Sequence, residues 1–132
     1  MSTEGFHRAV EALLTPSSAF KTAIGGRFNH VDDFKALPAM PYAAWFPVYS
    51  EPMDTFTARI NAKMIQIDIF AATRLECVQI ADKAKALFDG AVLSGAGIQP
   101  CRLVRGAEHG PEKTEDGGRQ MILEFTVYVQ DS

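Results

Sequence analysis

Two short polar segments hold the side chains best suited to binding a metal ion or transferring a proton. In the first, His30 is followed by Asp32 and Asp33, and imidazole nitrogens and carboxylate oxygens are common ligands of divalent metals. In the second, Glu108 is followed by His109 within a glycine-rich stretch. These two groups are the best support for a small metal-dependent enzyme or a ligand-binding domain. Their spacing is not that of a metal-binding motif, so solvated polar loops are the favoured interpretation.

Nothing else in the sequence predicts a reaction centre. The histidines at positions 7, 30 and 109 are far apart along the chain, and we expect them in separate environments. No serine lies in a nucleophile-elbow pattern. Neither Cys77 nor Cys101 has an evident histidine partner, so both are interpreted as buried thiols. The sequence therefore predicts no catalytic residue, no bound metal and no cofactor.

The two glycine-rich turns do not have the context of a phosphate-binding loop. Such a loop lies between a strand and the first turn of a helix. Gly25, Gly26 and Arg27 follow a predicted helix, whereas Gly95 and Gly97 precede a predicted strand. We therefore expect these glycines to provide turns with positive φ.

The composition is that of an ordinary globular domain without an excess of positive charge. The 132 residues are 47% hydrophobic and 22% charged, with a formal net charge of −3. Lysines and arginines are scattered, which argues against sequence-independent binding of nucleic acid. No apolar run approaches the ~18–20 residues of a membrane-spanning helix, and the first residues lack a secretory-signal pattern. We expect one domain over residues 1–132, with no membrane partner.

The clearest structural unit runs from Met64 to Gly90. Ile65, Ile67 and Ile69 alternate with polar residues, which predicts a strand with one buried face. The segment Thr73–Glu76 has capping-box spacing, in which each of its end residues bonds the backbone N–H of the other. An apolar stripe at helical spacing follows, formed by Cys77, Ile80, Ala81, Ala84, Leu87 and Phe88. We expect this helix to lie flat on one face of a sheet.

Shorter patterns predict the remaining elements. One helical pattern ends at Pro16, and a second follows a capping Ser17 and ends at Gly25 and Gly26. The other predicted strands are Tyr42–Tyr49, where Pro47 favours an edge or a bulge, Ile98–Arg105 and Gln120–Val129. Ser50–Ala62 and Gly106–Gly118 are predicted to be loops, the second of them exposed.

These elements predict an α+β fold, with a mostly antiparallel sheet of about four strands and helices packed on one face. The other face is partly apolar, with Phe70, Ile122 and Tyr128, and such a face is often a subunit contact. Trp45 is interpreted as a core residue, with a contact on a neighbouring subunit as the alternative.

The two predicted loops hold the candidate contact residues, because long loops in a compact domain are often functional. Those residues are Met53, Phe56, Arg59 and Ile60 in the first loop, and Glu108, His109, Glu112, Lys113, Glu115 and Asp116 in the second.

Four segments, taken in order, resemble the tail terminator and tail completion proteins of long-tailed bacteriophages. They are Leu13–Phe28, Leu37–Pro52, Met64–Gly90 and Arg119–Gln130, which together extend over nearly the whole chain. The single motifs are degenerate, so the resemblance lies in their order and spacing. Gly25, Gly26 and Arg27 match the turn that ends a short helix in that family, which is a structural feature.

The resemblance implies a virion structural protein without enzymatic activity. Such a protein would form a closed ring, typically of six copies, at the head-proximal end of the tail. It would stop polymerisation of the tail tube and provide the surface that joins the tail to the filled head. The implied partners are further copies of this chain, the tail tube protein and a head–tail connector protein. DNA would pass through the lumen without specific binding, and assembly would take place in the host cytoplasm.

Two alternatives stay open at this point. A neck or head-completion connector protein would lie on the other side of the same joint. A small metal-dependent enzyme or ligand-binding domain would instead use the groups around His30 and His109.

Overall fold

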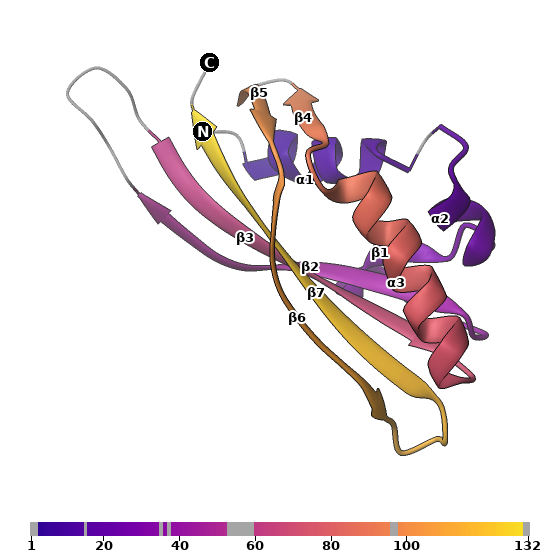
Figure 1. Cartoon of the computed structure of the whole chain (residues 1–132). Helices are drawn as coiled ribbons and strands as arrows, with labels where there is room; N and C mark the ends of the chain where they lie inside the picture. The colour runs from indigo at the N-terminus through magenta and orange to yellow at the C-terminus, as the bar shows by residue number, and fades with distance from the viewer. Residues whose placement is uncertain are drawn as a thin grey trace.

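A twisted sheet with all three helices on one side forms the body of the protein (Figure 1). The computed structural model describes residues 3–14, 16–34, 36, 38–52, 60–95 and 98–130. The helices are α1 (Thr3–Ala12), α2 (Ala19–Ala23) and α3 (Arg74–Phe88), and a short 3-10 turn, η1, spans Val31–Asp33. The strands are β1 (Phe28–His30), β2 (Tyr42–Pro52), β3 (Ile60–Ala71), β4 (Val92–Gly95), β5 (Ile98–Arg102), β6 (Val104–Lys113) and β7 (Arg119–Gln130). None of the helices described here is both long and apolar enough to cross a membrane.

The main sheet has five strands in the order β1-β2-β3-β7-β6. β1 runs parallel to β2, and the other neighbouring pairs are antiparallel. β4 and β5 form a separate two-stranded hairpin close to α1 (Figure 1). The predicted α+β class, with helices on one face, is confirmed. The main sheet differs from the expected four strands in two ways: it includes β1 and β6, which the sequence does not predict as strands, and most of the predicted strand Ile98–Arg105 forms β5 outside it. β1 has only three residues, too few for an alternation that would predict a strand.

The core lies between the helices and the inward sides of β3 and β7. Ile65, Ile67 and Ile69 are fully buried, as the alternation predicts. The inward residues of β7 are Met121, Leu123, Phe125, Val127 and Val129, and all are buried. Trp45 of β2 is opposite Ile67 and is fully buried within the single chain, so its interpretation as a core residue is confirmed.

α3 begins and ends close to where its sequence predicts. The Thr73 hydroxyl accepts a hydrogen bond from the Glu76 N–H at 3.2 Å. The Glu76 carboxylate accepts from the Ala72 N–H at 3.4 Å, one residue further back than the capping box requires. Gly90, just past the helix, has φ of 79°. The helix buries Cys77, Ile80, Ala81, Ala84 and Phe88, which are five of the six residues of the predicted stripe.

The predicted loop Gly106–Gly118 is wrong over most of its length. Residues up to Lys113 belong to β6, an edge strand paired with β7. Apart from the partly exposed Pro111, every side chain of β6 is exposed, so the strand has no hydrophobic alternation to detect. Its register also shifts between Arg105 and Glu108 and again between His109 and Glu112, as in strands with bulges.

Three other predicted boundaries also move. The predicted loop Ser50–Ala62 is shorter, because antiparallel pairing extends β2 to Pro52 and β3 back to Ile60. The predicted strand Ile98–Arg105 is interrupted at the buried Leu103, whose backbone N–H and carbonyl both bond to the segment that follows α3. Ser18, not Ser17, caps α2 by accepting from the Lys21 N–H at 3.0 Å. The register shift beyond Pro47 confirms the bulge that this proline favours.

Candidate interaction surfaces

The residues that suggested a metal site do not converge in the fold. His30 Nδ1 accepts a hydrogen bond from the Asp32 N–H at 3.1 Å, so the imidazole caps η1. Asp32 and Asp33 are exposed, and so are Glu108 and His109 on β6. In the part of the chain that the structure describes, no three or more His, Cys, Asp or Glu side chains are grouped to hold a metal ion.

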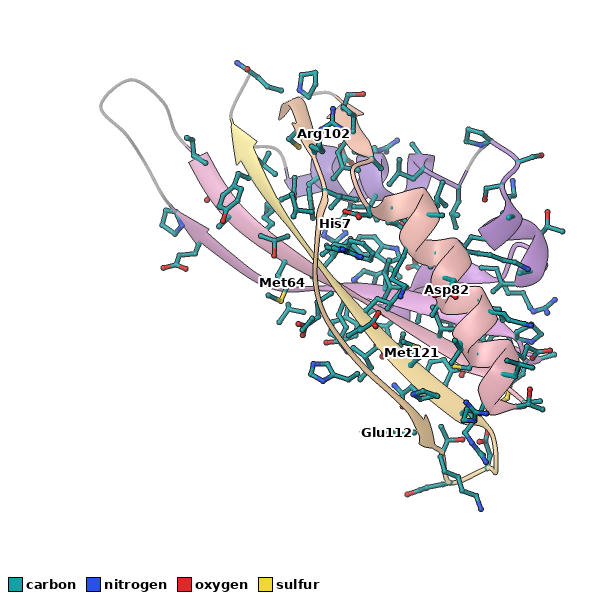
Figure 2. All side chains as sticks on the ribbon, viewed as in Figure 1. His7, Met64, Asp82, Arg102, Glu112 and Met121 are labelled. Atoms are coloured by element: carbon teal, nitrogen blue, oxygen red, sulfur yellow. The ribbon has the colours of Figure 1, made fainter. Side chains whose placement is uncertain are left out.

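The structure does bring together two histidines that the sequence separates. His7 of α1 stacks on His30 with ring centroids 5.5 Å apart, and each imidazole lies 5.1 Å from the Trp45 ring. The expectation of separate environments is therefore wrong for this pair. The parallel pairing of β1 with β2 places His30 beside Trp45, and nothing in the sequence pattern indicates that pairing. His7 lies in the crowded middle of the molecule (Figure 2).

A buried lysine adds positive charge near this cluster. Lys63 is only 5% exposed, and its Nζ lies 4.9 Å from the centroid of the Phe6 ring. Burial lowers the pKa of Lys63 below its ordinary value. The Trp45 indole N–H has no hydrogen-bond partner among the described residues. Aromatic packing thus lies beside His7 and Lys63, whose charged forms burial disfavours.

The fold should lose stability as the pH falls through the ordinary pKa of histidine. Burial, and then the neighbouring His30, lower the pKa of His7 below 6.5; Lys63 acts in the same direction, while Glu11 and Asp33 oppose it. Between 6.5 and the lower pKa of the folded state, the unfolded chain binds a proton that the fold excludes. The free energy of unfolding therefore decreases as the pH falls through that window. Melting temperatures measured from about pH 7.5 to about pH 5.5 check this.

A matched pair of variants isolates the contribution of His7. His7→Gln removes the half-buried imidazole and should flatten the pH dependence in that window. His109→Gln removes an exposed imidazole and should leave the dependence unchanged. If His7→Gln follows the wild-type curve, another group causes the pH dependence.

The candidate residues of the second predicted loop lie along β6 and the turn after it. Glu108 forms an ion pair with Lys85 of α3 at 3.0 Å, which ties the edge strand to the helix layer. Glu112 lies near the end of β6 that is remote from the N-terminus (Figure 2), and Lys113 is the last residue of the strand. His109, Glu112, Lys113 and Glu115 are all exposed. This edge is therefore polar and accessible.

The turn between β6 and β7 is ordered by Asp116. Its carboxylate accepts hydrogen bonds from the Thr114 hydroxyl and, at 3.2 Å, from the Gly118 N–H. The Thr114 hydrogen bond, followed by that of Gly118, lowers the pKa of Asp116. Asp116 thus helps to shape the turn, in addition to its candidate role as a contact.

The other candidate residues have mixed outcomes. Met53, Phe56 and Arg59 lie outside the described residues. Ile60 is the first residue of β3, paired with β7 and half-buried, so it does not belong to a loop.

The predicted glycine turn is confirmed. Gly25 and Gly26 have φ of 60° and 74°. The Arg27 Nε donates to the Pro41 carbonyl at 3.0 Å, which ties the turn to the start of β2. These residues therefore have a structural role.

The sheet face opposite the helices carries an apolar pocket, which we call the open-face pocket. Its cavity volume is ≈ 340 Å³, and its walls are formed mainly by Val31, Phe34, Tyr42, Ala44, Asp68 and Phe70. Tyr42 and Phe70 stack with ring centroids 4.7 Å apart, and Phe34 packs edge-on against Tyr42 at 5.8 Å. The sequence predicted the outward position of Phe70. It did not predict the wall contributed by η1, because that segment has no periodic pattern.

Asp68 contributes a carboxylate to the open-face pocket. It accepts hydrogen bonds from Gln66 Nε2 at 2.8 Å and from Gln120 Nε2 at 3.4 Å. Burial raises the pKa of Asp68, and the two amide hydrogen bonds oppose that change. Among the described residues no cation pairs with it. The pocket thus joins an apolar surface to a partly buried negative charge.

Two comparisons with known proteins, one with family models and one with solved structures, each give a match over nearly the whole chain. The family model described as "Tail completion protein gp17" matches residues 8–130. A similar solved structure is a chain of the "Virion of native gene transfer agent (GTA) particle", with a TM-score of 0.74 and 16% sequence identity. The match covers 94% of this chain and 93% of that chain, and at this identity it shows a shared fold. No curated protein sequence matches significantly.

Proposed function

This chain belongs to the tail completion protein gp17 family, and from that premise we propose that it forms a closed ring at the head-proximal end of a phage tail. Membership of the family supports a structural role in a phage tail, and so within the virion. The ring ends polymerisation of the tail tube, joins the tail to the filled head and catalyses no reaction. The family match is the main support for this proposal, because the matched residues 8–130 include the strands of both sheets.

The shape of the domain supports assembly into a ring. A closed ring of identical subunits needs two different surfaces on each copy that fit one another. Here the helices cover one face of the sheet (Figure 1). The opposite face holds the open-face pocket. The two faces therefore differ in both shape and polarity. We propose about six copies in the ring, because six is the usual number in the family that the sequence resembles. Six identical head-to-tail contacts can close with cyclic symmetry.

The exposed edge of β6 supports contacts with other tail components. We propose that Glu108, His109, Glu112, Lys113, Glu115 and Asp116 contact the tail tube protein or the head–tail connector protein, together with Ile60 and the neighbouring Met53, Phe56 and Arg59. Charged and polar side chains of this kind suit the rim of an interface between assembled parts.

The charge of the chain supports passage of DNA through the ring. A formal net charge of −3 provides little net attraction for phosphates. Contacts that neutralise phosphates would hold DNA instead of letting it slide. We propose that DNA crosses the lumen without specific binding, and that the ring assembles in the host cytoplasm.

Two measurements on the purified protein test this function. Sedimentation over a range of concentrations should show a closed oligomer of about six copies. Negative-stain images should then show a ring added to purified tails that lack the protein, and not to filled heads. Rings on heads alone would instead indicate a neck connector protein. A protein that stays monomeric at every concentration and binds neither particle would contradict the proposal.

A further inference from the structure

The first turn of α3 presents an exposed leucine beside an arginine without a partner. Leu75 is 59% exposed, the highest value among the exposed large hydrophobic residues that the structure describes. Arg74 is exposed and has no hydrogen bond or ion pair with the described part of the chain. The other described arginines are Arg8, Arg27, Arg102, Arg105 and Arg119, and each has a hydrogen bond or an ion pair. We call Arg74 and Leu75 the α3 knob.

The position of Leu75 on α3 keeps its side chain away from the core. The residues that α3 buries begin with Cys77, two positions after Leu75. Two helical positions correspond to a rotation of about 200°, so Leu75 points away from the buried side. A single exposed leucine is common on protein surfaces and needs no explanation by itself. Leu75 is significant here because Arg74 lies beside it and because the open-face pocket has complementary chemistry.

The open-face pocket has the complementary chemistry. Tyr42 and Phe70 form an apolar wall, and the cavity of ≈ 340 Å³ has room for a leucine side chain. Asp68 provides a carboxylate that accepts hydrogen bonds only from two side-chain amides among the described residues. A guanidinium group is the cation best matched to a carboxylate, because it can donate two parallel hydrogen bonds. The pocket is therefore suited to an apolar side chain adjacent to an arginine.

The knob cannot fill the pocket of its own chain. α3 packs on the side of the sheet that buries Ile69, whose carbonyl accepts from the Cys77 thiol at 3.6 Å. Asp68 and Phe70 alternate with Ile69 along β3 and so project to the opposite side. The sheet lies between the two surfaces, so an α3 knob that occupies the pocket must come from another copy of the chain.

We propose that the α3 knob of one copy occupies the open-face pocket of the next, with Leu75 against Tyr42 and Phe70 and Arg74 paired with Asp68. Each copy then gives one knob and one pocket, which is a head-to-tail contact that closes into a ring when the rotation between copies allows it. The inference rests on the ring function proposed above and identifies the contact between its subunits.

Charge reversal tests this contact on the full-length protein. Arg74→Glu and Asp68→Arg should each weaken self-association by at least about thirtyfold in sedimentation, since each places like charges together in the contact. The double variant, and an equimolar mixture of the two single variants, should both recover association, because either restores an opposite pair. Arg8→Glu reverses an exposed arginine on α1 and should associate as the wild type does.

Milder variants cover the case in which Asp68→Arg fails to fold. Asp68→Asn keeps the shape of the side chain, and it should weaken association while melting no lower than the wild type. Leu75→Ser should weaken association, whereas Val92→Ser, at a residue 49% exposed on β4, should not. Wild-type rings together with equally stable rings of Arg74→Glu, Leu75→Ser and Asp68→Asn would overturn this contact and leave the ring function standing. A wild type that never oligomerises would overturn the ring function itself.

Discussion

Ile67→Asp should unfold the domain. Ile67 is fully buried on the central strand β3, between Trp45 of β2 and Leu123 of β7. A carboxylate at this position loses its hydration among apolar side chains, so the cost exceeds about 4 kcal/mol. That is comparable to the whole free energy of unfolding of many small domains, which is about 5–15 kcal/mol. Circular dichroism should show loss of the cooperative melting transition, and the protein should accumulate in the insoluble fraction.

Tyr128→Asp is the matched control for this prediction. Tyr128 lies on β7, one strand away from Ile67, but it is 56% exposed. The same introduced charge should therefore remain hydrated and change the melting temperature little. A soluble Ile67→Asp variant with the wild-type melting temperature would show that the inward side of β3 is misassigned.

Trp45→Ala should cost the monomer about 3–5 kcal/mol, the range for removing a buried aromatic side chain from a core. Trp45 is fully buried, and both His7 and His30 lie against its ring. The substitution leaves a cavity and removes the surface on which the two imidazoles pack. Urea unfolding followed by circular dichroism measures the loss, because the variant has no tryptophan fluorescence. Trp45→Phe should lose less, since it retains an aromatic ring.

The control for Trp45 is Val48→Ala on the same strand. Val48 is 45% exposed, so its truncation should be nearly neutral. A Trp45→Ala monomer with the wild-type free energy of unfolding would contradict the position of Trp45 in the core.

The elements that the sequence predicts well are those with one buried side. Ile65, Ile67 and Ile69 alternate because only one side of β3 enters the core. α3 is equally recognisable, because its buried residues recur at helical spacing after the Thr73 cap. In both elements the burial pattern repeats along the chain, so local sequence is sufficient.

The elements and sites that sequence reasoning missed depend on contacts between distant segments. β6 has no buried side, so its glycines and charges have the composition of a loop. The stacking of His7 on His30 requires the parallel pairing of β1 with β2. The open-face pocket requires η1 to lie over Tyr42, which no periodicity predicts. The polarity of the sequence was enough to select candidate residues on the exposed β6 edge. It did not predict that these residues lie on a strand.

The irregular course of β6 affects how copies can associate. As the last strand of the main sheet, β6 has no neighbouring strand on one side within the described structure. Its register shifts twice, and Pro111 has no N–H to donate, so a continuous ladder with another chain is hard to build there. Such interruptions disfavour the edge-to-edge fibrils that a regular exposed strand can form. Copies of this chain should therefore associate through surfaces other than a continuous β6 ladder.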